Sequence, residues 1–172
     1  MNVGEEEERL ANLYIASYNL HASLELGEVV SVILEICINL VGADRTVFYV
    51  HDEEREQLVP VAGQGDAALP EATVALGEGP VGQAALAGAI RLQATEVPAA
   101  VVPFVVDGRL VGVLSVETLL PQKGAFSPLD AEIFELLGRQ GAAALYGAFL
   151  AGTRPKKITA EEFRTRLRSQ GR

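Results

Sequence analysis

Apolar and polar positions alternate with different spacings along the chain, and each spacing predicts an element. From Glu5 to about His21, apolar side chains lie three and four residues apart, which is the spacing of an amphipathic helix. From Leu26 to about Val41, apolar residues occupy most of the helical circumference and leave only a narrow polar edge. We therefore expect a first helix that is exposed along one side and a second helix that is largely buried.

The stretch from Val97 to Glu117 predicts two strands joined by a tight turn at Asp107-Gly108, because these residues tolerate the positive φ angles of a type I′ turn. A two-residue turn fixes which residues face each other across the hairpin. The expected pairs are Val106 with Arg109, Val105 with Leu110, Phe104 with Val111 and Pro103 with Gly112. Both faces of this hairpin are mostly apolar, so we expect it to lie inside a sheet whose two faces are covered.

Shorter patterns complete the expected fold. Strands are predicted at Arg45 to His51, Leu58 to Ala62, Thr73 to Leu76 and Ile90 to Gln93, with a short helix that enters at Pro80 and ends before Gly88. Ser127-Pro128-Leu129-Asp130 has the serine cap, early proline and first-turn carboxylate of a helix start. That helix should run to about Leu150 and carries several small residues, so another element should pack closely against it.

The charge of the chain is unevenly distributed. The formal net charge is -9, while the segment from Gly152 onward has seven basic and two acidic residues, or +5, so the remainder carries -14. We therefore expect a body of residues 1–151 and a basic tail of residues 152–172 with a short helix. A body this acidic should repel nucleic acid and anionic membranes, so neither is expected as a partner. The acidic start and the lack of an apolar run of about 20 residues favour a soluble, cytoplasmic protein.

The residues that could carry chemistry are few. Cys37 is the single cysteine, so an internal disulfide and a cysteine metal framework are excluded, and we expect this thiol to lie in the core. The two histidines lie far apart in the sequence, and no nucleophile is accompanied by a base and an orienting group. We therefore expect no enzyme activity, no cofactor and no metal.

Two motifs together resemble those of the GAF domain family, over roughly Ser23 to Leu150. The first is the Gly-Glu-Gly-x-x-Gly signature (Gly77, Glu78, Gly79, Gly82), and the second is the hairpin with Val-Pro-Phe on one strand (Val102, Pro103, Phe104) and Gly-Val-Leu on the other (Gly112, Val113, Leu114). The resemblance implies an α+β fold: an α/β/α sandwich with a central antiparallel sheet of about six strands and with the N- and C-terminal helices packed on one face. It also implies a signalling or regulatory role and dimers formed by the first and last helices.

The chain departs from the ligand-binding members of that family. The segment that covers the pocket in those members is reduced here to about Ala94 to Pro98, and of the cyclic-nucleotide set only Phe126 and Asp130 are present. Cys37 does not lie where bilin-binding members attach their chromophore, and one cysteine cannot replace the several that the family's methionine sulfoxide reductases use. We therefore expect a stand-alone, degenerate GAF protein of a bacterial signalling system, with a reduced pocket. A small-molecule sensor that regulates a separate output protein is the alternative.

Two interaction surfaces are expected. The heptad spacing of the first helix fits either packing on its own domain or pairing with a second copy. For a homodimer, the expected interface residues are Leu10, Leu13, Ser17, Leu20, Ile133, Leu137, Gly141, Ala144 and Ala148. The tail should dock on an acidic surface, its own or that of an unknown signalling protein, through Phe163, Leu167, Arg164 and Arg168.

Overall fold

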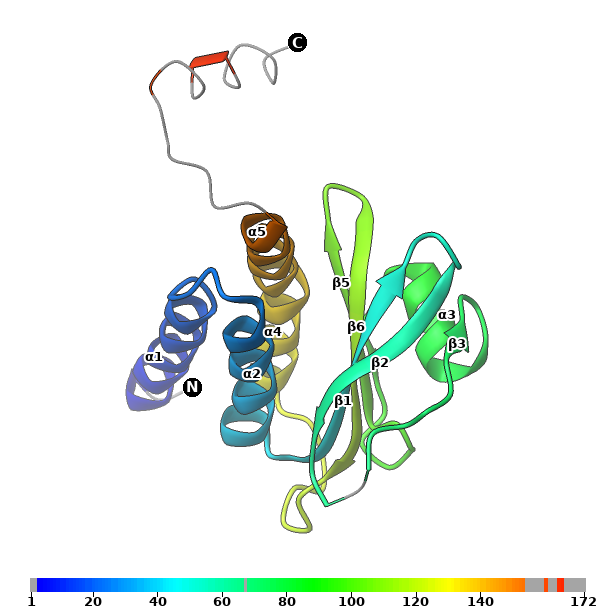
Figure 1. The fold of residues 1–172 in the computed structure, drawn as a ribbon. Helices are drawn as coiled ribbons and strands as arrows, with labels where there is room; N and C mark the ends of the chain where they lie inside the picture. Colours follow the sequence, from blue (N-terminus) through cyan, green and yellow to red (C-terminus); the bar gives the residue numbers. More distant parts are fainter. Residues whose placement is uncertain (1–2, 67, 154–159, 161–163, 166–172) are drawn as a thin grey trace.

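The computed structural model of the chain describes residues 3–66, 68–153, 160 and 164–165. Its centre is a six-stranded antiparallel sheet in the order β3-β2-β1-β6-β5-β4 (Figure 1). The strands are β1 (Ala43–Asp52), β2 (Gln57–Gln64), β3 (Val74–Ala75), β4 (Arg91–Leu92), β5 (Ala100–Val106) and β6 (Arg109–Leu119). The predicted α+β class with an antiparallel sheet of about six strands is confirmed.

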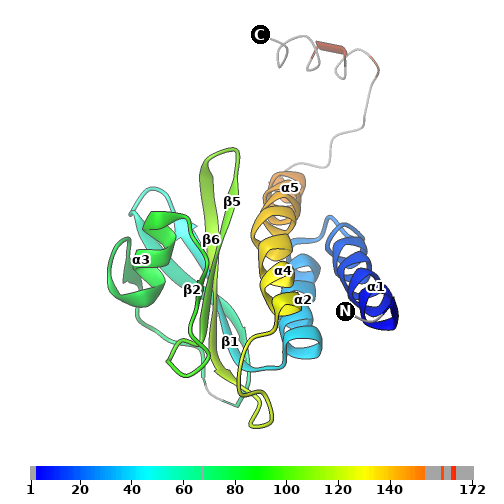
Figure 2. The same ribbon diagram turned by 180° about the vertical axis from the view of Figure 1, so that it is seen from behind.

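The helices cover the two faces of the sheet unequally. They are α1 (Val3–Leu20), α2 (Leu26–Ile36), α3 (Gly79–Ala87), α4 (Pro128–Leu136) and α5 (Ala142–Thr153), with single π-helical turns at Cys37–Val41 and Leu137–Gly141. The α2 helix and the α4–α5 helix lie on one face, α1 lies outside them, and α3 covers the other face (Figures 1 and 2). The expectation that the N- and C-terminal helices pack on one face is therefore confirmed.

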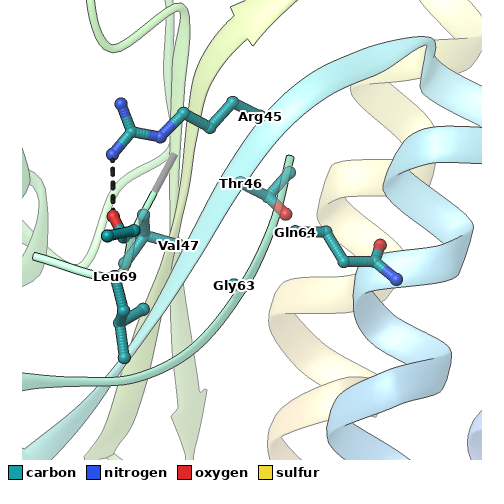
Figure 3. Close-up of a pocket in the computed structure, with 7 residues that line it drawn as sticks. Arg45, Thr46, Val47, Gly63, Gln64 and Leu69 are labelled. Carbon is teal, nitrogen blue, oxygen red and sulfur yellow. Dashed lines mark hydrogen bonds between the residues drawn. The ribbon is translucent and has the colours of Figure 1, made fainter. Parts of the chain in front are cut away.

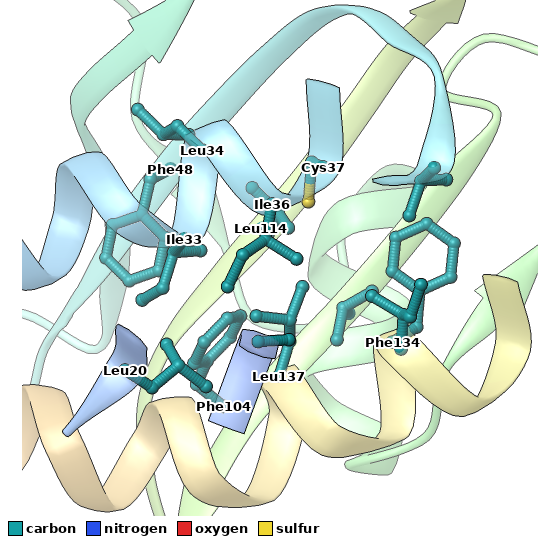
Figure 4. Packing of buried hydrophobic residues seen from close by; sticks show 14 of the residues in the cluster. Leu20, Ile33, Leu34, Ile36, Cys37, Phe48, Phe104, Leu114, Phe134 and Leu137 are labelled. Atoms are coloured by element: carbon teal, nitrogen blue, oxygen red, sulfur yellow. The ribbon is translucent and has the colours of Figure 1, made fainter. Parts of the chain in front are cut away.

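The larger core lies between the sheet and the helices α2, α4 and α5 (Figure 4). Phe104 on β5 is fully buried, and its ring meets the ring of Phe48 on β1 edge to face, with 5.4 Å between the ring centres. The small residues of the last helix face this point. A Cβ atom added at Gly141 would lie 2.6 Å from the Phe104 ring, and one at Gly138 would lie 3.0 Å from the Pro103 carbonyl oxygen. The element that packs closely against the small residues is therefore the chain's own strand β5.

A second, smaller core lies between the sheet and α3, built from Val47, Tyr49, Leu58, Val81, Ala84, Ala85, Val101 and Val113. Gly82 lets α3 approach β3, because a Cβ atom there would lie 2.2 Å from the carbonyl oxygen of Ala75. Gly77 and Gly79 have φ angles of 85° and 59°, which residues other than glycine rarely adopt. The glycines of the signature therefore have a structural role in seating α3.

The β5–β6 hairpin has the predicted turn but not the predicted register. Asp107 and Gly108 have positive φ angles, and the two pairs next to the turn are as expected. Between Phe104 and Val105 the register shifts, so Phe104 pairs with Gly112 and the two predicted pairs farther from the turn are wrong. The extra residue is Val111, which has no partner on β5, and it brings Gly112 opposite Phe104 at a point where β1 is so close that a Cβ atom on residue 112 would lie 2.4 Å from the carbonyl oxygen of Tyr49. This β-bulge places Leu114 in the larger core and Val113 in the smaller one.

The predicted start of the last long helix is confirmed. The hydroxyl oxygen of Ser127 accepts a hydrogen bond from the backbone N–H of Asp130 at 3.2 Å, and the Asp130 carboxylate accepts one from the N–H of Ser127 at 2.6 Å. Lys123 adds an ion pair to the buried Asp130 at 2.7 Å. Asp130, which the resemblance to cyclic-nucleotide-binding GAF domains singled out in the sequence, is therefore engaged in fixing the helix start.

We predict that Gly141→Ala lowers the free energy of unfolding by about 1–3 kcal/mol, because the added methyl group overlaps the buried Phe104 ring. The matched control is Gly147→Ala on α5, where no atom lies within 4 Å of the added methyl group. Removing a helical glycine there should raise stability by up to about 1 kcal/mol. Urea unfolding of both variants measures the difference. Equal effects in the two variants would contradict the close approach of the last helix to β5.

Candidate functional site

Most of the residues predicted to form a dimer interface lie inside the chain's own core. Leu20, Ile133, Leu137, Gly141 and Ala148 are buried in the single chain, and Leu13, Ser17 and Ala144 are partly buried. The reason is the packing described above, because the small-residue face of the last helix contacts β5 and its other side contacts α1. The buried residues are thus not available to a second copy while the domain stays folded. Of the predicted set, Leu10 is largely exposed, at 54%.

The inner side of α1 is fixed to the rest of the domain by polar and apolar contacts. The Arg9 guanidinium donates to the Glu132 carboxylate on α4 at 2.6 Å, and the Ser17 hydroxyl donates to the side-chain oxygen of Gln140 at 2.6 Å. Between these contacts, Ala16 is fully buried. The helix therefore presents one defined side to the domain and the opposite side to its surroundings.

The outward side of α1 carries an apolar stripe, which we call the α1 stripe: Leu10, Tyr14 and Tyr18. Residues four apart on a helix are rotated by about 40°, so these three side chains lie within about 80° of each other. Tyr14 and Tyr18 are 71% and 65% exposed, and their rings stack with 6.4 Å between centres. The sequence analysis missed the two tyrosines, although their spacing of four residues was a signal for a second apolar side. Aligned exposed apolar residues of this kind mark interaction surfaces.

A cleft of about 660 Å³ opens between α2, α5 and the adjacent ends of β1, β2 and the β5–β6 hairpin, and we call it the α2–α5 cleft. Its lining is mainly apolar and includes Leu26, Val30, Val50, Val61, Leu145 and Phe149. No sequence signal pointed to this cleft, because its lining comes from five separate stretches of the chain. Its volume falls in the range of about 300–1,000 Å³ that small-molecule sites occupy.

The rim of the α2–α5 cleft is acidic and is bridged by one arginine. Asp52, Glu53 and Glu54 line the cleft beside Arg109, which donates to the Tyr146 hydroxyl at 2.7 Å and pairs with Glu53 at 3.1 Å. Two hydrogen bonds from Arg55 lower the pKa of the Asp52 carboxyl. The larger effect comes from the backbone N–H of Arg55, and the smaller comes from its guanidinium. The Asp52 carboxylate therefore stays ionised at neutral pH. With Arg55 paired to Asp52 and Arg109 paired to Glu53, the three acidic and two basic side chains leave this rim with a net charge of -1.

His51 also lines the cleft, and one of its ring nitrogens is a buried hydrogen-bond acceptor. Its Nδ1 lies 3.1 Å from the carbonyl oxygen of Leu110. Because a carbonyl can only accept, Nδ1 carries the hydrogen in the neutral ring and Nε2 is the acceptor. Within the described residues, Nε2 is buried and has no hydrogen-bond partner. Because Nε2 is buried, the charge of the rim comes from its carboxylates, which suits a ligand group that is positively charged.

A much smaller pocket of about 80 Å³ lies along the start of β1 and the end of β2 (Figure 3). The Arg45 guanidinium reaches from β1 to the carbonyl oxygen of Ala68 at 3.4 Å and closes one side. Tyr49 lies nearby on the α3 side of the sheet, and the pKa of its hydroxyl is raised mainly by burial and secondly by the negative charge of Glu117. The positive charge of Arg45 lowers this pKa and partly offsets the rise. This volume suits a few water molecules and is well below that of ordinary small-molecule sites.

Cys37 lies in the larger core at the first residue of a π-helical turn (Figure 4). Its side chain is fully buried, and burial raises the pKa of the thiol well above its ordinary value near 9. A thiolate is the reactive form, so this thiol is chemically inert in the folded chain. Within the described residues, no group of three or more His, Cys, Asp or Glu side chains could hold a metal ion, and no helix could cross a membrane.

The predicted contacts of the tail fall mostly outside the described residues. Phe163, Leu167 and Arg168 lie there, so the structure does not test them. Arg164 is described and is exposed.

Comparison with known proteins gives a family match and several structural neighbours. The family model of the GAF domain matches residues 23–145. The GAF domain of a phosphoenolpyruvate-protein phosphotransferase from Coxiella burnetii superposes with a TM-score of 0.71 at 18% identity, over 85% of this chain and 97% of that one. The corresponding Acinetobacter domain gives 0.71 at 19% identity, over 86% and 98%. No curated protein matches the chain.

A structural neighbour with a reported enzymatic activity is also similar. The free methionine-R-sulfoxide reductase from Neisseria meningitidis, solved with its substrate, gives a TM-score of 0.65 at 22% identity, over 81% of this chain and 89% of that one. At these identities the structural likeness establishes the fold and nothing further about activity.

We predict that stability falls more steeply between pH 9 and pH 10 in the unchanged chain than in Cys37→Ala. The thiol of the unfolded chain ionises in this range while the buried thiol keeps its proton, so the unfolded state gains stability as pH rises. The difference between the two proteins should be about 1 kcal/mol per pH unit. Tyr49 contributes equally to both and cancels. Parallel stability curves from urea unfolding would show that Cys37 is not buried as described.

Proposed function

Because the chain belongs to the GAF domain family, whose members are signalling and regulatory modules, we propose that it is a non-catalytic regulatory module that acts as a homodimer and binds a signalling protein. The observation that carries this proposal is the α1 stripe. Leu10, Tyr14 and Tyr18 lie side by side on a helix whose opposite side is fixed to the domain, so they can be covered only from outside.

Two copies of the α1 stripe are suited to contact each other. A two-fold axis brings the same side chains of both chains together, and aromatic rings are enriched in such contacts because they bury much area with little loss of conformational freedom. The proposed interface therefore keeps Leu10 from the sequence prediction and replaces its buried members with Tyr14 and Tyr18. It uses the first helix alone, since the members of the predicted set on the last helix are buried or partly buried within the domain.

The proposal that the module lacks catalysis rests on the state of its one thiol. The structural neighbours include a free methionine-R-sulfoxide reductase. Cys37 is the single cysteine of this chain and is enclosed by the larger core, where burial raises the pKa of its thiol. A protonated thiol without access to solvent does not attack a sulfoxide. We propose the cytoplasm as the location, since a stable free thiol is common there.

Small-molecule sensing is the alternative function, and one observation favours it. The α2–α5 cleft has the volume of a small-molecule site, about 660 Å³, and is lined mainly by apolar side chains. Its acidic rim selects a ligand that is apolar in the body and positively charged at one end. Such a ligand would bind on the helix side of the sheet, away from the small pocket at Arg45.

We predict that the unchanged chain is a dimer in sedimentation equilibrium and that Leu10→Glu shifts it to monomer. The substitution places one charge from each chain into the same two-fold interface, which should raise the dissociation constant by a factor of about 100 or more. The matched control is Leu86→Glu on α3, where the leucine is 68% exposed on the other side of the molecule.

The control variant should remain a dimer, since both substitutions add the same charge to an exposed helical leucine. A monomeric unchanged chain at all concentrations would refute the proposed dimer. A dimer that Leu86→Glu weakens as much as Leu10→Glu would show that the effect is one of net charge.

A further inference from the structure

The floor of the α2–α5 cleft exposes large apolar side chains that no described residue covers. Phe149 on α5 is 56% exposed and Val61 on β2 is 50% exposed, and they line the cleft with Val50, Leu110 and Leu150. An apolar surface of this kind, enclosed between a helix pair and a sheet, is suited to an amphipathic helix.

The rim of the cleft specifies the charge of its occupant. Asp52, Glu53 and Glu54 stand together at the turn between β1 and β2, where Arg55 pairs with Asp52 at 2.9 Å and Arg109 pairs with Glu53 at 3.1 Å. The three carboxylates and two guanidinium groups leave the rim with a net charge of -1. The best occupant therefore has an apolar side for the floor and a cationic group for the rim, and arginine suits it because its guanidinium can pair with a carboxylate through two N–H groups.

The chain itself contains a segment with this chemistry. Residues 154–172 follow α5 directly and carry a charge of +5, because seven basic residues outnumber two acidic ones. Thr159-Ala160-Glu161-Glu162 has the sequence of a capping box, and Phe163 and Leu167 are spaced four apart, on one side of the helix that it opens.

The position of the tail makes an intramolecular contact feasible. Phe149 and Leu150, in the last turns of α5, line the cleft, and α5 ends at Thr153. The six residues 154–159 can span up to about 20 Å when extended, so a helix that begins near Ala160 can return to the cleft. Ala160, Arg164 and Thr165 are exposed in the structure, so the contact requires the segment to fold back.

We propose that the tail docks in the α2–α5 cleft of its own chain, with Phe163 and Leu167 on the apolar floor and arginines at the acidic rim. The tail then occupies the surface that the alternative function assigns to a small ligand. A partner with an amphipathic basic helix would have to displace it. The cleft and the α1 stripe share no residue, so this inference is independent of the proposed dimer.

Paramagnetic relaxation in the full chain tests the docking. Ser169→Cys introduces a second thiol for a nitroxide label, while buried Cys37 does not react. The expected result is broadening of the methyl signals of Val50, Val61 and Leu110, and no broadening of Val47 or Val101 in the smaller core. Absence of broadening at the cleft would overturn the proposal.

Variants of the tail and the rim identify the contacts. Phe163→Ser with Leu167→Ser should abolish the broadening, whereas the control Thr165→Ala with Gln170→Ala should preserve it. Glu53→Gln with Glu54→Gln should weaken it, whereas Glu7→Gln with Glu8→Gln on α1 should not. Broadening that survives the loss of Phe163 and Leu167 would contradict docking through the apolar pair.

A mixed sample separates the chain's own tail from that of a second copy. Spin-labelled chains without isotopes are mixed with isotope-labelled chains that carry no spin label. Docking within one chain predicts that the cleft signals of the isotope-labelled chains stay sharp. The reference is the earlier sample, in which each chain carries both the spin label and the isotopes. If the cleft signals broaden as much in the mixture as in that reference, the tails exchange between copies and the proposal is overturned.

Discussion

The contact between Phe104 and the last helix determines how the rest of the molecule can be used. The Phe104 ring is fully buried against Phe48, and the helix reaches it only because residue 141 has no side chain. This contact fixes the distance between the helices and the sheet. It also places the small-residue side of the helix, which looked like an interface in the sequence, inside the domain. Apolar surface that remains exposed must therefore be sought on other elements.

In the part of the chain that the structure describes, two surfaces gather several exposed apolar side chains each. The α1 stripe faces away from the domain, and the α2–α5 cleft opens where α5 ends. The α3 side of the sheet, by contrast, is filled by the smaller core, and the pocket at Arg45 holds only about 80 Å³. The exposed apolar surfaces of this GAF domain thus lie mainly on or beside its helices, which favours contacts with partners through helices.

The sequence predicted local features well and the choice of packing partner poorly. The turn at Asp107-Gly108, the capped helix start at Ser127 and the buried Cys37 depend on neighbouring residues, so their patterns were sufficient. The β-bulge at Val111 was missed, although the neighbouring Gly112 was a signal, since a glycine inside a strand is a known sign of a bulge. The heptad pattern of α1 could not be resolved either, because the helix has two apolar sides and spacing does not show which one faces the domain.

The π-helical turns at Cys37–Val41 and Leu137–Gly141 have no sequence signature that we could have used. The α2–α5 cleft was equally hidden, because its lining joins residues that are about 100 positions apart. Such features arise from the meeting of distant segments. They determine the candidate sites more than any local motif in this chain does.

Contacts between copies of the chain in solution give the most direct test of the central claim, that the α1 stripe is the dimer interface. In an equal mixture of isotope-labelled and unlabelled chains, filtered nuclear Overhauser spectra report only contacts between copies. The α1 interface predicts such contacts between the Tyr14 and Tyr18 rings of one chain and the Leu10 methyl groups of the other. Intermolecular contacts elsewhere, with none from these residues, would contradict it.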